Sequence, residues 1–253
     1  MGRVNKRAIA VMILSQVPLA GVALAGVAND STILQQLLIS QQCNGCNLSN
    51  ASLSGTQLAG VSLERANLQN ANLREAVLSN SNLQGADLTG ADLRATVLTR
   101  ADLTTATLLN SNLADARLAY ADLTQADLQS ANLTAAIAPE SNFTETNLTT
   151  ALLPRAILIK ASFTSADLSE ADLQAADLTE TYLLRTDLSN ANLRSADLSR
   201  ARLVRSNFNG VDLTDANLRD AVMRRATFEG ATFCRTIMPD GTQNNEDCAA
   251  EPS

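Results

Sequence analysis

The sequence of 253 residues contains no histidine and no tryptophan. Histidine is the usual general base, the commonest metal ligand and a member of the ordinary catalytic triad, so its absence argues against those kinds of site. Aromatic residues make up only 3% of the chain, which means that a core must be built mainly from leucine and alanine. The sequence also shows no glycine-rich phosphate loop and no metal-ligand cluster. We therefore predict a protein that is not an enzyme and that uses no cofactor or metal.

Basic residues are in the minority, with 19 arginines and lysines against 26 aspartates and glutamates and a formal net charge of −7. An acidic chain is poorly suited to bind the phosphate backbone of a nucleic acid as its main task. We therefore expect no nucleic-acid partner.

The first 28 residues have the pattern of a signal peptide. Basic residues at the start precede a mostly apolar stretch, and small residues then offer cleavage after Ala25 or Ala28. The alternative is an uncleaved anchor, since residues 8–28 are just long enough to cross a bilayer, although glutamine, proline and glycine within them weaken it. We predict an exported protein that contacts the membrane only transiently, through residues 1–28.

A five-residue repeat occupies most of the remaining chain. The stretch "SNLQGADLTGADLRATVLTRADL", residues 81–103, has leucine at every fifth position. The register holds from Leu48 to Met238, with a large apolar residue at every centre except Ala138. The residue two positions before each centre is small, and the residue just before it is often aspartate or asparagine. A period held over this length outranks any local propensity for helix or strand.

A period of five fits neither regular helix nor flat strand. On a helix, leucines five apart would spiral around the axis, and on a strand they would alternate between the two faces. They share one interior only if the backbone itself turns a corner in every repeat, and four such corners close a coil of about twenty residues. Aspartate, asparagine, serine, threonine and glycine suit the turns, while the small residue and the leucine fill the interior.

This array, A-(D/N)-L-x-x, resembles the pentapeptide-repeat family over roughly residues 44–240. The resemblance implies an all-β solenoid, a right-handed quadrilateral β-helix, here of about ten coils. A stacked coil exposes open backbone edges at both ends, which need covers. Residues 29–43 fit a short N-terminal capping helix, because the apolar residues of "TILQQLLISQQ" share one helical face. Residues 241–253 would form the C-terminal cap or tail.

Four cysteines allow three disulfide pairings. Cys43 and Cys46 lie near one end of the expected rod, and Cys234 and Cys248 lie at the other. Because the Cα atoms of a disulfide must approach within about 7 Å and the rod is roughly 45 Å long, we predict Cys43–Cys46 and Cys234–Cys248. Both fit an oxidising compartment. The alternative for "CNGC" is a redox-active pair.

The segments that flank the repeat resemble those of exported cyanobacterial members of the family, with a short helix before "CNGC" and "CRTIMPDG" near the end. The resemblance implies the periplasm or the thylakoid lumen as the location.

Residues twenty apart should stack on one side of the rod. The side through Leu48 then carries acidic residues without basic ones, and the side through Leu53 mixes signs. The side through Leu63 gathers arginines toward the C-terminal end: Arg185, Arg202, Arg205, Arg224 and Arg225, beside Tyr182. The side through Leu58 carries an outward apolar column, our candidate interaction surface: Val77, Val97, Ile137, Ile157 and Ile159, interrupted by Arg117 and flanked by Tyr120.

Three functions are compatible with these features. The first is a non-enzymatic, exported scaffold that recognises an unidentified protein partner, or a second copy as a homodimer. The second follows from the resemblance, because some family members imitate duplex DNA and act on DNA gyrase, which would require a cytoplasmic protein. The third is a lumenal thiol redox sensor that uses Cys43 and Cys46. The first is our principal prediction.

Overall fold

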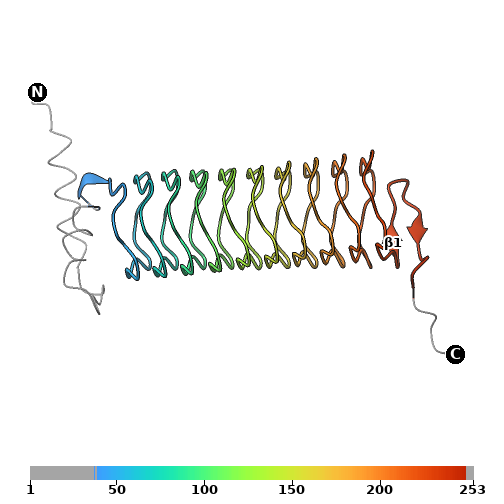
Figure 1. The fold of residues 1–253 in the computed structure, drawn as a ribbon, viewed down its shortest axis with the longest axis horizontal. Helices are drawn as coiled ribbons and strands as arrows, with labels where there is room; N and C mark the ends of the chain where they lie inside the picture. Colours follow the sequence, from blue (N-terminus) through green and yellow to red (C-terminus); the bar gives the residue numbers. More distant parts are fainter. Residues whose placement is uncertain (1–36, 38, 249–253) are drawn as a thin grey trace, which may run out of the picture.

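Residues twenty positions apart lie side by side in the computed structural model, which describes residue 37 and residues 39–248. Parallel bridges join such pairs along the chain, from Gln42 with Ser62 to Asn217 with Ile237. Each coil therefore contains twenty residues, and the coils follow one another in chain order along a rod (Figure 1).

The backbone turns once in every five residues, so each coil has four sides. Around each centre, one amide donates to the following coil and another to the preceding one. Leu103 N–H donates to the carbonyl of Asp122 (2.7 Å), and Asp102 N–H donates to the carbonyl of Ser81 (2.9 Å). The second residue after each centre has a positive φ, from Asn50 (60°) to Arg235 (52°), and most of these residues are not glycine. The sequence had shown which residues suit the turns but not that this position would be left-handed.

The interior is filled by the repeat centres and by the small residues two positions before them. Leucine centres from Leu48 to Leu218 are at most 2% exposed, and the exceptional Ala138 is fully buried as well. Phe143 and Phe163 stack with ring centroids 4.8 Å apart, as neighbouring coils allow. The large residues thus share one interior, as the five-residue period predicted.

Some of the small interior residues are serine or threonine, and their hydroxyls are paired with backbone carbonyls. Ser81 Oγ donates to the carbonyl of Leu78 in its own coil (2.6 Å), whereas Thr96 Oγ1 donates to the carbonyl of Leu73 in the preceding coil (2.8 Å). In the described part of the chain no buried side-chain nitrogen or oxygen lacks a partner. The interior therefore accommodates these hydroxyls without leaving a buried donor or acceptor unpaired.

A short hairpin ends the rod. Strand β1, Thr236–Ile237, pairs antiparallel with strand β2, Gln243–Asn244, and Ile237 also bridges in parallel to Asn217 of the preceding coil. The chain reverses between the two strands at Gly241, whose φ is 82°. The antiparallel strand β2 therefore covers the backbone edge of the last coil, which would otherwise be unpaired at the C-terminal end of the solenoid.

The N-terminal cap is only partly visible. Gln41 N–H donates to the carbonyl of Leu37 (2.9 Å), which is a helix-type hydrogen bond, and Leu37 is fully buried. Residues 37, 39 and 40 are helical, but no helix with defined bounds is present among the described residues, so the cap helix expected over residues 29–43 stays a prediction. Most of that segment, and the expected signal peptide at residues 1–28, lie outside the described residues.

Candidate interaction surfaces

The expected apolar column is present on one side of the rod. Parallel bridges join Val77 to Val97, Val97 to Arg117, Arg117 to Ile137 and Ile137 to Ile157. Ile137 and Ile157 are 36% and 38% exposed, whereas the two valines are less exposed. The exposed apolar part of the column is therefore the two coils that follow Arg117.

Tyr120 and Ile159 border this column. Tyr120 is 49% exposed; its ring lies under the guanidinium of Arg100 at 5.3 Å, and its hydroxyl donates to Glu140 Oε1 at 3.3 Å. Ile159 is half-buried. A partner that covered the ring of Tyr120 would therefore also contact the charged side chains of Arg100 and Glu140.

One exposed apolar residue of this region was missed from the sequence. Leu152 is 45% exposed and lies on the adjacent side of the coil that contains Ile157. It occupies the outward position just before a centre, bridged to Asn132 and Asp172. The signal that could have found it was a leucine at a position where the repeat has aspartate or asparagine. From here on, the apolar patch denotes Tyr120, Ile137, Leu152, Ile157 and Ile159.

The aspartates of the acidic side are engaged in the turns. Their carboxylates accept the backbone N–H of the residue after the centre, as Asp167 Oδ1 does from Ser169 (2.9 Å) and Asp187 Oδ1 from the corresponding Ser189 (2.9 Å). Asn207 Nδ2 in the next coil also donates to Asp187 Oδ1 (3.0 Å). These bonds give the acidic residues a structural role in holding the corners.

The arginines of the side through Leu63 lie together at the C-terminal end of the rod. Four of them, Arg185, Arg205, Arg224 and Arg225, line a groove of about 380 Å³, whose other lining residues include Leu184 and Val204. Arg202 lies over the ring of Tyr182 at 5.8 Å. The sequence had placed these residues on one side, but the groove required the coordinates.

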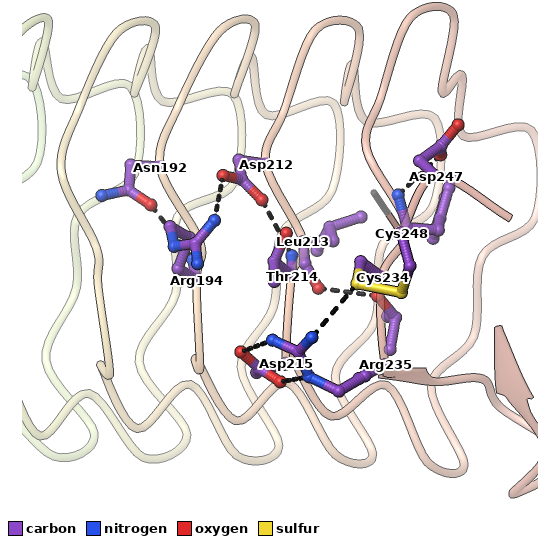
Figure 2. Close-up of polar contacts among 12 residues, drawn as sticks. Asn192, Arg194, Asp212, Leu213, Thr214, Asp215, Cys234, Arg235, Asp247 and Cys248 are labelled. Carbon is purple, nitrogen blue, oxygen red and sulfur yellow. Dashed lines mark hydrogen bonds and ion pairs between the residues drawn. A yellow bond between two sulfur atoms is a disulfide. The ribbon is translucent and has the colours of Figure 1, made fainter. Parts of the chain in front are cut away.

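The four cysteines form two disulfides, Cys43–Cys46 and Cys234–Cys248, with Cα atoms 5.3 Å and 4.7 Å apart. These are the pairs expected from the ends of the rod. The second one fixes the chain after β2 to the coil that precedes β1 (Figure 2). Asp247, next to Cys248, strengthens this link by accepting the backbone N–H of Phe233 (2.8 Å).

Ion pairs run along the same end of the rod (Figure 2). Arg235 donates to Asp215 through Nε (2.6 Å) and Nη2 (2.8 Å), and these bonds hold the pKa of Asp215 below its ordinary value. Arg194 Nη1 donates to Asp212 (2.9 Å). Burial raises the pKa of Asp212, but the hydrogen bonds from Thr214 and Arg194 outweigh it, so that this pKa is lowered too.

Within the described residues, no group of three or more acidic or cysteine side chains could hold a metal ion. No helix there has the length and apolar character needed to cross a membrane.

The family model for pentapeptide repeats matches this chain in eight overlapping copies: residues 42–80, 56–94, 71–110, 96–134, 111–149, 141–179, 171–210 and 201–238. No curated protein matches the sequence significantly.

Several solved structures resemble the chain. HetL, a pentapeptide repeat protein involved in heterocyst differentiation regulation from the cyanobacterium Nostoc sp. strain PCC 7120, is 29% identical, with 85% of this chain and 98% of HetL covered and a TM-score of 0.37. A pentapeptide repeat protein from the Arabidopsis thaliana thylakoid lumen is 28% identical, with 37% of this chain and 66% of that protein covered and a TM-score of 0.36. QnrB1, a plasmid-mediated fluoroquinolone resistance protein, is 13% identical, with 76% of this chain and 90% of QnrB1 covered and a TM-score of 0.49.

The repeat matches join without a gap from residue 42 to residue 238, the same stretch over which the coils stack. The chain therefore belongs to the pentapeptide-repeat family, whose members form right-handed quadrilateral β-helices.

Proposed function

We propose that this protein is an exported, non-enzymatic scaffold, a rod of about ten coils that binds a protein partner through its apolar patch. The observation that carries the proposal is the exposure of large apolar side chains at an outward position that elsewhere in the repeat is mostly polar. Ile137 and Ile157 stack in successive coils at 36% and 38% exposure, with Tyr120 at 49% on the same side of the rod and Leu152 at 45% on the adjacent side.

The fold does not require apolar residues at these positions. The same position in neighbouring coils is occupied by Arg117 before the patch and by Asp177 after it. Exposed apolar side chains gathered in this way are typical of protein-binding surfaces, where burial of the patch stabilises a complex. Arg100 and Glu140 at the border of Tyr120 provide polar groups for the rim.

Export is supported by the N-terminal pattern of a signal peptide and by the two disulfides. The periplasm or the thylakoid lumen would provide the oxidising environment. Sequencing of the mature N-terminus from the source cells tests this part: a chain that starts at Gly26 or Asn29 supports export. An intact Met1 form in the cytoplasm would contradict it.

The binding surface is tested by replacement of Ile137 and Ile157 with asparagine, a residue that already occupies the equivalent outward position at Asn132 and Asn142. The double variant should fold as the wild type does and lose the partners that the wild type captures from the native compartment. The matched control is Tyr182→Asn/Val222→Asn, which removes apolar side chains of 42% and 40% exposure from another side of the rod.

Partners should remain with the control and be lost with Ile137→Asn/Ile157→Asn. If the partner is a second copy of this chain, light scattering should show a dimer that dissociates in the patch variant alone. If the patch variant retains all partners, the apolar patch is not the surface that binds them.

The two alternative functions have less support. The acidic residues that could imitate DNA phosphates are bonded within the turns, and arginines cluster on another side near the C-terminal end of the rod. A redox role would need an accessible sulfur in the Cys43–Cys46 pair, in which Cys43 is only 3% exposed and Cys46 is half-buried.

A further inference from the structure

Three arginines form a ladder on the side of the rod through Leu63. Arg185, Arg205 and Arg225 are the second residues after the centres of three successive coils, and all three have a positive φ. Hydrogen bonds between coils fix their spacing: Arg185 N–H donates to the carbonyl of Val204 and Arg205 N–H to that of Arg224, both at 3.0 Å. The ladder is therefore anchored on rigid backbone.

The charges of this ladder are not neutralised within the described part of the protein. Arg185, Arg205 and Arg225 are exposed, as are Arg202 and Arg224 beside them, and none of the five forms an ion pair with a described acidic residue. Elsewhere on the rod, some arginines have acidic partners in adjacent coils, as Arg235 does in Asp215 and Arg194 in Asp212. Others, such as Arg117 and Arg219, have no ion pair with a described acidic residue either. What distinguishes the five arginines is that they lie on one side of the rod within three successive coils.

The repeat does not demand arginine at these positions. In the earlier coils of the same side, the equivalent position has no preferred charge: Arg65, Gly85, Thr105, Gln125, Glu145 and Ser165. Like charges on adjacent coils, about 5 Å apart, repel one another. This concentration of positive charge on one short stretch of the rod would attract an anionic ligand.

The groove has both charged and apolar residues in its lining. It measures about 380 Å³; Leu184 and Val204 form half-buried apolar parts of its lining, and Arg185, Arg205, Arg224 and Arg225 provide guanidinium groups. A purely anionic ligand would use only the guanidinium groups. The apolar part of the lining favours a ligand that also has apolar side chains.

We propose that this groove binds a short acidic polypeptide segment of a partner protein, with its carboxylates on the arginine ladder and its apolar side chains on Leu184 and Val204. Arginine binds carboxylates through two parallel hydrogen bonds, which makes it well suited to this role. The ladder spans roughly 10 Å, the length of about three residues of extended chain. This surface is separate from the apolar patch, and its role does not depend on the function proposed for that patch.

A protein segment fits better than a nucleic acid. The groove is short, and the side that follows it along the coil carries Asp167, Asp187 and Glu229 without a basic residue. The whole chain has a formal net charge of −7. A duplex longer than the groove would therefore meet repulsion beyond it, whereas a short acidic segment would not.

The test uses the full chain and a fluorescein-labelled peptide of alternating acidic and apolar residues, Asp-Leu-Glu-Val-Asp-Leu-Glu, with fluorescence anisotropy as the readout at low and physiological salt. The variant Arg205→Glu/Arg225→Glu should weaken binding about tenfold or more, because it reverses the charge of two ladder residues. It should leave folding intact, since Glu140 and Glu145 already occupy the same repeat position with the same φ.

The matched control is Arg65→Glu/Arg155→Glu, with the same charge change at the same repeat position (φ 54° and 58°) outside the groove. It should change affinity by no more than about twofold. A peptide with serine in place of leucine and valine should bind more weakly than the original, and raised salt should weaken both.

The proposal is overturned if the peptide fails to bind at low salt, if the control weakens binding as much as the groove variant, or if the serine peptide binds equally well. Tighter binding of a 20-base-pair DNA duplex or of anionic vesicles than of the peptide, abolished by Arg205→Glu/Arg225→Glu, would also overturn it and assign the groove to that ligand.

Discussion

The backbone at the second residue after each repeat centre is left-handed even where the side chain opposes it. Ala95 has a φ of 55°, and its N–H donates to the carbonyl of Ala114 in the next coil (2.9 Å). The left-handed region costs a residue with a Cβ roughly 1–2 kcal/mol, whereas glycine adopts it freely. Hydrogen bonding between coils and burial of the leucines offset this cost in every repeat.

Replacement of Ala95 by glycine should therefore stabilise the rod by about 1 kcal/mol, measured as a higher midpoint of denaturant unfolding. Gly55→Ala should destabilise it by a similar amount, because Gly55 has a φ of 65° at the equivalent position and an added Cβ would meet no atom within 4 Å, so that only the backbone cost remains. Ala91→Gly is the control, because Ala91 is a buried small residue outside the left-handed set. Stabilisation by Ala91→Gly, or destabilisation by Ala95→Gly, would contradict this account.

Carboxylates with lowered pKa make the stability of the rod depend on pH. The hydrogen bonds from Arg94 and Arg235 lower the pKa of Asp92 and of Asp215 from an ordinary value of 3.8. The folded state then binds fewer protons than the unfolded state, so these groups stabilise it above about pH 4. This contribution is lost as the pH falls through the folded-state pKa.

Thermal melts between pH 7 and pH 2 should show a smaller loss of melting temperature for Asp92→Asn/Asp215→Asn than for the wild type. Arg235→Gln, which removes the hydrogen-bond donor to Asp215, should also show a smaller loss of melting temperature than the wild type. If the melting temperature depends on pH equally in all three proteins, the ion pairs of Asp92 and Asp215 do not determine the loss of stability at low pH.

At the scale of the element, the hairpin of β1 and β2 ends a ladder that is otherwise parallel. Ile237 bonds on one side to the preceding coil and pairs on the other side with Gln243 of β2. A parallel stack with an uncovered edge would accept a further strand from another molecule. The Cys234–Cys248 disulfide closes the loop that contains the hairpin and so keeps this cover in place.

The variant Cys234→Ala/Cys248→Ala should lose about 3 kcal/mol of stability, the typical effect of a disulfide that closes a loop of this length. Copies of this variant should also associate with one another more readily than copies of the wild type, as measured by light scattering at raised protein concentration. Denaturant unfolding measures the first effect, and Cys43→Ala/Cys46→Ala is the comparison for the second, because its disulfide closes a separation of only 3 residues. Unchanged association in the C-terminal variant would show that β2 covers the edge without help from the disulfide.

At the scale of the whole molecule, each coil within residues 42–237 is bridged only to the coils before and after it. All bridges of the rod join residues twenty apart, so the stability of a coil depends on itself and on its two neighbours. A defect inside one coil should therefore remain local, in contrast to a defect in a globular core.

Leu103→Asp places a charge at a fully buried centre, which costs several kcal/mol. Hydrogen exchange should show lost protection in the coils that contain Leu83, Leu103 and Leu123, with protection retained near Leu198. Asp102→Asn, an outward change one residue away, should leave protection unchanged. Equal loss along the whole rod would mean that it unfolds as one cooperative unit.

The leucine period from Leu48 to Met238 is enough to predict the solenoid, because it has one physical solution, a backbone that turns around its own side chains. The same period placed Ile137 beside Ile157 and Arg205 beside Arg225, since stacking at twenty residues follows from four corners of five. The left-handed residue of each turn, the exposed Leu152 and the hairpin pairing of Thr236 with Asn244 were not foreseen. These features, and the groove beside Leu184, emerge only in three dimensions, because they depend on hydrogen bonds and side-chain spacing between coils, which a five-residue pattern does not encode.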